Sequence, residues 1–67
     1  MKIEKLIELG TIIRETRKSQ GLTQKDLALA AGIGVRLIVE LEKGVRGVKI
    51  DTVIKVCKLL GLKIDIT

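Results

Sequence analysis

The sequence of 67 residues predicts an all-α domain, a compact bundle of four to five helices that ends in a short β-strand. Two observations lead to this prediction. Apolar residues recur at helical spacing along most of the chain, which is the main sequence signal of amphipathic helices. Seven glycines and no proline punctuate that pattern, so the helices are expected to be short and to end at glycines. We expect residues 1–67 to form a single domain, because a chain of this length supports one hydrophobic core at most.

The first two helices are predicted from apolar spacing and from a capping signal. Leu9–Ser19 carries apolar residues on one face and charged residues on the other, and a glycine follows it closely. Thr23 can act as the N-cap of a second helix over about Thr23–Ala31, with Asp26 at the position that completes a capping box. Residues 1–8 are expected to form either an N-terminal arm or an extension of the first helix.

Two further helices and a strand are predicted in the C-terminal half. The third helix is expected over Val35–Lys43 and the fourth over Asp51–Leu60. The fourth has more apolar residues than one stripe can hold, so one face should meet the core and another a partner. Residues 62–67 alternate between apolar and polar, which predicts a strand. A lone strand leaves its backbone groups unpaired, so we expect this segment to pair with its copy in a homodimer.

The composition favours a polyanionic partner and argues against several other classes. The net charge of +5 and the isoelectric point of about 9.7 suit a nucleic acid. Cys57 is the only cysteine and there is no histidine, so we expect no disulfide, no metal and no other cofactor. No apolar run is long enough for a membrane span and no secretory signal begins the chain, so a cytoplasmic protein is expected. An enzyme is disfavoured, because the chain offers no paired catalytic carboxylates and too little length to enclose a site.

Residues 24–43 have the pattern of a helix-turn-helix. Two short helices that meet at a sharp angle need small residues at their crossing and a residue that can adopt positive φ in the turn. Ala28 and Gly32 satisfy these two requirements. The apolar residues that would lock the two helices together are Leu27, Ala31, Ile33, Ile38 and Leu41. The alternative is an ordinary helical hairpin with no role in DNA binding, which the basic charge of the chain disfavours.

The chain resembles the Cro/phage-repressor (XRE-type) helix-turn-helix family from Leu9 to Leu60. The matching motifs are Leu9-Gly10, Ile13-Arg14, Arg17, Gly21-Leu22-Thr23-Gln24, Leu27-Ala28, Ala31-Gly32, Ile38, Leu41-Glu42 and Gly44. The resemblance implies a lambda-repressor-like DNA-binding domain, in which Glu42 pairs with Arg17 and ties the first helix to the third. Two C-terminal motifs are also similar to HipB-like antitoxins, namely Val48-Lys49-Ile50-Asp51 and Leu60-Gly61-Leu62-Lys63-Ile64.

In such folds the third helix lies in the major groove, so its outward residues should read bases. Arg36 can bond O6 and N7 of guanine together, although the alternative is a phosphate contact without sequence information. Val35 and Val39 could contact thymine methyl groups, and Glu40 could accept a hydrogen bond from N4 of cytosine. Gln24 begins the second helix, where backbone N–H groups attract a phosphate; the alternative is that it is simply solvated. The complete set of predicted DNA-binding residues is Thr23, Gln24, Lys25, Val35, Arg36, Val39, Glu40, Lys43 and Arg46.

These interpretations together predict a transcriptional repressor that binds double-stranded DNA as a homodimer at a palindromic operator. The similarity to HipB-like antitoxins implies a narrower role, in which the protein also holds a HipA-like kinase toxin and represses their shared operon. A phage Cro/CI-like regulator is one alternative. A protein-interaction module that kept the fold without DNA binding is another.

Overall fold

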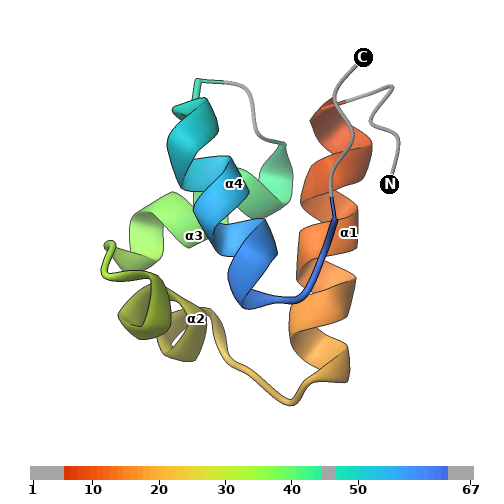
Figure 1. The fold of residues 1–67 in the computed structure, drawn as a ribbon, viewed down its shortest axis with the longest axis vertical. Coiled ribbons are helices and arrows are strands. Elements are labelled where there is room, and N and C mark those ends of the chain that lie inside the picture. The colour runs from red at the N-terminus through yellow and green to blue at the C-terminus, as the bar shows by residue number, and fades with distance from the viewer. Residues whose placement is uncertain (1–5, 45–46, 64–67) are drawn as a thin grey trace.

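A computed structural model of the protein describes residues 6–44 and 47–63. Its helices are α1 (Leu6–Ser19), α2 (Gln24–Ala31), α3 (Val35–Lys43) and α4 (Ile50–Leu59), arranged as shown in Figure 1. The described part of the chain contains no strand, and the predicted all-α bundle of four to five helices is confirmed with four helices in these residues. Within these residues no helix combines the length and the apolar character that crossing a bilayer requires.

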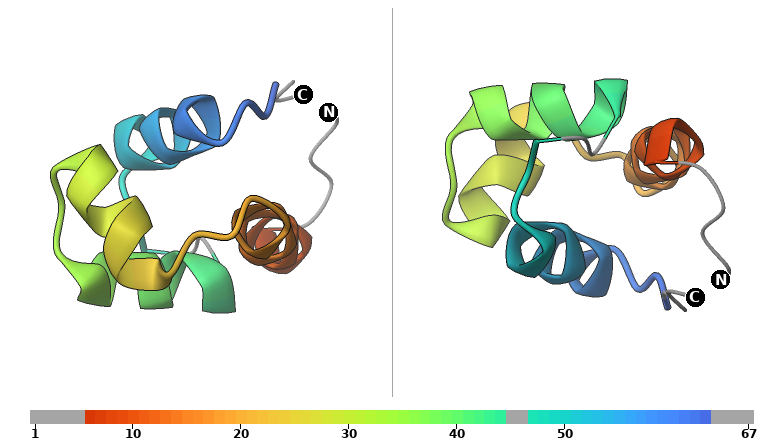
Figure 2. Two further views of the ribbon diagram at one scale, coloured as in Figure 1. Left: turned by 90° about the horizontal axis from the view of Figure 1, so that it is seen from below. Right: turned by 90° about the horizontal axis from the view of Figure 1, so that it is seen from above.

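The helices enclose one core. α3 packs on both α1 and α2, and α2 also packs on α4. Figure 2 views α1 nearly along its axis and shows α3 and α4 on opposite sides of the molecule. α2 lies between α3 and α4 and packs on both. The core contains four of the five residues predicted to lock α2 to α3, and the fifth, Ile33, packs against it half-buried. The buried hydrophobic residues that form this core are aliphatic apart from one thiol: Leu9, Ile13, Leu27, Ala28, Ala31, Ile38, Leu41, Val53, Val56, Cys57 and Leu60.

α1 and α4 end in the same hydrogen-bond pattern, which explains why each is followed by a glycine and a leucine. After α1, the N–H groups of Gly21 and Leu22 donate to carbonyl groups three and five residues earlier, at 3.0 and 3.1 Å. Gly61 and Leu62 close α4 in the same way, at 3.0 and 2.8 Å. The glycines have φ of 72° and 78°, a conformation that other residues adopt only with strain. Gly32, in the turn between α2 and α3, has φ of 69°, as the helix-turn-helix pattern predicts.

The cap of α4 also explains why the strand predicted over residues 62–67 does not begin where it was expected. Leu62 gives its N–H to the end of α4, and its side chain packs against the core. Leu62 and Lys63 therefore continue in an irregular conformation, and the prediction is wrong for these two residues. Residues 64–67, on which the predicted pairing in a homodimer also depends, lie outside the described residues.

The bounds of α1 and α4 differ from the prediction, and Gly10 makes a close contact that the sequence did not indicate. α1 begins at Leu6, so residues 6–8 extend the helix, and residues 1–5 lie outside the described part of the chain. α4 begins and ends one residue earlier than predicted. Gly10 lies inside α1, and a Cβ atom there would lie only 2.6 Å from the carbonyl oxygen of Leu41. Gly10 therefore allows the C-terminal turn of α3 to pack directly on α1.

Candidate nucleic-acid interface

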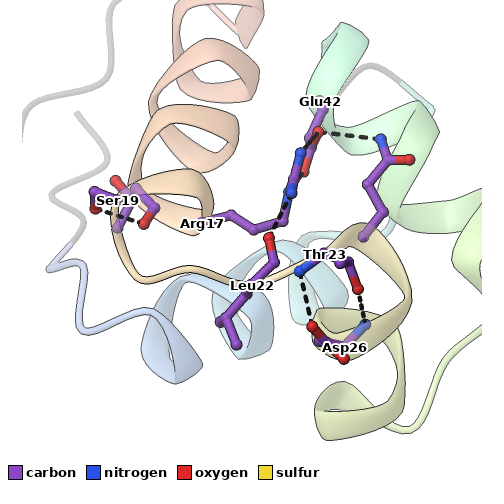
Figure 3. Close-up of polar contacts among 8 residues, drawn as sticks. Arg17, Ser19, Leu22, Thr23, Asp26 and Glu42 are labelled. Atoms are coloured by element: carbon purple, nitrogen blue, oxygen red, sulfur yellow. Dashed lines mark hydrogen bonds and ion pairs between the residues drawn. The ribbon is translucent and has the colours of Figure 1, made fainter.

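An ion pair between α1 and α3 braces the helices beneath the candidate interface. Arg17 donates from Nε to Oε2 of Glu42 at 2.6 Å and from Nη2 to Oε1 at 3.1 Å. Its Nη1 donates to the carbonyl oxygen of Leu22 at 2.6 Å. Figure 3 shows the Arg17 side chain held between Leu22 and Glu42. The two charged side chains are 9% and 5% exposed. The pair that the family resemblance implied is confirmed.

The brace extends to α2 through Gln24. Nε2 of Gln24 donates to Oε1 of Glu42 at 3.2 Å, so a single carboxylate links α1, α2 and α3. The hydrogen bond from Arg17 to Glu42 raises the pKa of Arg17 above its usual value, against the opposing effect of burial. Gln24 thus uses one amide hydrogen inside the protein. Its other N–H and its carbonyl oxygen remain for a ligand.

The predicted capping box at the start of α2 is confirmed (Figure 3). Oγ1 of Thr23 accepts from the N–H of Asp26 at 3.0 Å, and Oδ2 of Asp26 accepts from the N–H of Thr23 at 2.9 Å. The hydrogen bond that the Thr23 N–H donates to the carboxylate lowers the pKa of Asp26, and the Thr23 side chain adds to this effect, because both favour the ionised form. The cap orients the first turn of α2. Thr23 and Lys25, both predicted to contact DNA, are exposed there.

α3 presents one continuous outer face. Helical geometry advances about 100° per residue, so five residues of α3 share a side opposite to the buried Ile38 and Leu41. Four of the five are exposed and Val39 is half-buried. This face, which we call the α3 face, consists of Val35, Arg36, Val39, Glu40 and Lys43. All five belong to the predicted DNA-binding set. Arg46, the remaining member beyond α3, lies outside the described residues.

A surface hollow of about 330 Å³ lies beside the α3 face. Its lining brings Gln24 of α2 together with Val39 and Lys43 of α3, whereas the other members of the predicted set that the structure describes do not line it. The sequence interpretation assigned no role to Arg14, although the spacing of three residues before Arg17 places both on one side of α1. The complete lining is Arg14, Arg17, Gln24, Val39, Glu42 and Lys43. The hollow is thus lined by three cations, an amide, one valine and one carboxylate that is already paired.

Comparison with known sequences identifies the family. Residues 13–66 match the helix-turn-helix family. An uncharacterised HTH-type transcriptional regulator, y4mF of Sinorhizobium fredii, is 42% identical over 65 residues, which cover 97% of this chain and 86% of that protein. A second uncharacterised HTH-type transcriptional regulator, from Methanothermobacter thermautotrophicus, is 50% identical over 36 residues, 54% of this chain and 52% of that protein.

Comparison with solved structures agrees with this result. The restriction-modification controller protein C.AhdI from Aeromonas hydrophila superposes with a TM-score of 0.75 and 29% identity, over 87% of this chain and 88% of that one. A point mutant of the restriction-modification controller protein C.Esp1396I gives a TM-score of 0.79, over 91% of this chain and 79% of that one. Its identity is 24%, so the likeness concerns the fold alone. Since the family match covers most of the chain and the braced α2–α3 unit is present, this protein belongs to the Cro/phage-repressor (XRE-type) family of helix-turn-helix transcriptional regulators.

Proposed function

We propose that the protein is a transcriptional repressor that binds double-stranded DNA sequence-specifically, with the α3 face in the major groove. The observation that carries this proposal is the α3 face itself, which is exposed, bears two cations and one acid, and lies on a helix anchored by Ile38 and Leu41. A base-reading helix must keep its side chains in register with base edges. The Arg17–Glu42 pair, which ties α3 to α1, supports such a register.

Each residue of the α3 face has a chemistry suited to a groove. The guanidinium of Arg36 can donate two parallel hydrogen bonds to O6 and N7 of guanine. Val35 and Val39 can contact thymine methyl groups, and Glu40 can accept from N4 of cytosine while disfavouring other bases. Lys43 and Arg46 are proposed as phosphate contacts, which position the helix without reading sequence.

The start of α2 is proposed to hold a phosphate of the DNA backbone. Backbone N–H groups at a helix N-terminus favour an anion, and the capping box fixes the geometry of this turn. Gln24 can donate its second amide hydrogen to the phosphate while the first remains on Glu42. Thr23 can donate its hydroxyl hydrogen, because in the cap its oxygen acts as an acceptor. Lys25 adds a positive charge on the same exposed turn.

We also propose that the repressor acts as a homodimer on a palindromic site. One domain reads few base pairs, whereas two copies related by a two-fold axis double the contacts at half-sites about one helical turn apart. Ile50 and Leu59, at the two ends of α4, remain 54% and 45% exposed, so α4 keeps apolar side chains outside the monomer core that a partner subunit could cover. In this proposal residues 64–67 contribute to the dimer contact.

The experiment is selection of a preferred duplex from a randomised pool, followed by fluorescence-anisotropy titration of that duplex and a scrambled copy. Arg36→Ala should weaken binding to the selected sequence by about 1–3 kcal/mol and reduce discrimination at one guanine. Lys58→Ala is the matched control, because Lys58 is an exposed cation on α4, across the molecule from α3 (Figure 2). Equal affinity of the unmodified protein for both duplexes would refute sequence-specific repression and favour a protein-interaction module.

Two finer roles fit the same DNA-binding proposal. The likeness to C.AhdI, at 29% identity and with most of each chain covered, supports a controller of restriction-modification genes. The similarity of Val48-Lys49-Ile50-Asp51 to HipB-like antitoxins supports an antitoxin that binds a HipA-like kinase. Genes for a nuclease and a methyltransferase beside this one would favour the first role. A kinase gene would favour the second, and a phage neighbourhood would favour a Cro/CI-like regulator.

A further inference from the structure

We propose that the hollow where α1, α2 and α3 meet binds a DNA backbone phosphate and that Arg14 of α1 is a DNA contact. The inference rests on the proposed DNA-binding function and adds a third helix to the interface. Arg14 and Lys43 are exposed and both line the hollow. Among residues 6–44 and 47–63, neither has an ion-pair partner.

The charge of the hollow favours an anion. Three cations and one acid line it, and the acid, Glu42, is held by two hydrogen bonds from Arg17. This pair neutralises itself, which leaves the charges of Arg14 and Lys43. Gln24 also lines the hollow, and its amide nitrogen donates one hydrogen bond to Glu42. The second N–H of the same amide is left to donate to an anion. A phosphate is the anion that a DNA duplex would present at this place.

The position of the hollow points to the DNA backbone as the source of that phosphate. Val39 and Lys43 belong both to the α3 face and to the lining of the hollow, so the two surfaces are continuous. Gln24 lies at the first position of α2, where a phosphate is already favoured by the helix N-terminus. A duplex with α3 in its major groove would therefore bring one strand past the hollow. Arg14 would meet that strand from α1.

The test is the salt dependence of binding to a short mixed-sequence duplex, which needs no knowledge of the operator. Each phosphate contact contributes about 0.9 to the slope of log affinity against log salt concentration, so one contact is worth about eightfold over a tenfold salt range. Arg14→Gln should lose this factor and bind selected and scrambled duplexes more weakly by the same ratio, since a phosphate contact carries no sequence information. Lys58→Gln removes the same charge from α4 and should keep the unmodified slope.

A second variant separates a DNA contact from a structural effect. Arg14→Lys keeps the positive charge and should restore most of the slope, whereas a packing role of the guanidinium would not be restored. Thermal melts followed by circular dichroism should be unchanged for all three variants, because Arg14 and Lys58 are exposed. If Arg14→Gln retains the unmodified slope, the inference is wrong while the proposed function stands. If the unmodified protein shows no salt-dependent duplex binding, the proposed function itself fails.

Discussion

Truncation of Glu42 tests whether the brace between α1 and α3 stabilises the domain as the structure indicates. Glu42→Ala removes the two carboxylate oxygens of α3 that accept hydrogen bonds from the Arg17 side chain. One of these oxygens also accepts from the amide of Gln24, so that bond is lost as well. Arg17 keeps its bond to the carbonyl oxygen of Leu22, but its guanidinium becomes an unpaired charge with only 9% of the side chain exposed. The variant therefore leaves a largely buried cation without its carboxylate partner.

The expected loss is about 3 kcal/mol. Removing one partner of a buried ion pair costs about 3–5 kcal/mol. We take the lower end because both residues line a hollow of about 330 Å³, which admits water beside the stranded Arg17. A domain of 67 residues has a total stability of about 3–10 kcal/mol, so a loss of this size removes between about a third and all of that stability.

The measurement is urea denaturation followed by far-UV circular dichroism, because the chain has no aromatic residue to report by fluorescence. Arg17→Met combined with Glu42→Leu provides the control. This double variant buries no charge, so it should be more stable than Glu42→Ala despite losing more hydrogen bonds. Glu42→Ala with an unchanged urea midpoint would refute the brace. A double variant no more stable than Glu42→Ala would refute the unpaired charge as the cause of the loss.

Three further predictions concern other parts of the fold. Gly10→Ala should lower the melting temperature and cost about 1–3 kcal/mol, because the new Cβ atom meets backbone atoms of α3 and outweighs the better helix propensity of alanine. Asp26→Asn should destabilise the protein at neutral pH. Folding lowers the pKa of Asp26, so the ionised carboxylate contributes its full share to the free energy of unfolding above about pH 5. This share is lost as the pH falls through the pKa that Asp26 has in the folded protein. Burial raises the pKa of Cys57 to about 11, so iodoacetamide should modify the thiol far more slowly in the native protein than in urea.

Each of these predictions has a contrary result that would count against its reasoning. A Gly10→Ala variant that melts at or above the unmodified temperature would mean that α3 does not approach α1 as closely as the structure shows. A stability difference for Asp26→Asn that persists unchanged into strong acid would rule out the ionised cap. Rapid modification of Cys57 by iodoacetamide in the native protein would mean that α4 exposes the face that packs on the core.

Much of the local structure could be predicted from the sequence, because helix ends are encoded by adjacent residues. Thr23 and Asp26 lie three positions apart, and their reciprocal bonds depend only on that spacing. Gly32 marked the positive-φ turn for the same reason. Leu62 shows the limit of such patterns. Its alternating neighbours predicted a strand, whereas the cap of α4 uses its N–H and the core takes its side chain.

In the candidate interface, too, some features follow from local spacing and others depend on contacts between distant residues. Helical spacing alone placed the five residues of the α3 face on one side, since the position of each around the axis follows from its number. The link between Arg17 and Glu42 spans 25 positions, and the family resemblance, not local spacing, implied it. The engagement of Gln24 with Glu42 was not predicted at all.

The sequence by itself therefore determined the four helices, the capping box at Thr23, the helix-turn-helix and the outward face of α3, because these depend on interactions between near neighbours in the chain. Only the tertiary structure decided the close contact at Gly10, the carboxylate shared by three helices and the hollow that includes Arg14. These features need distances between residues far apart in sequence, which are set by how α1, α2 and α3 pack on one core.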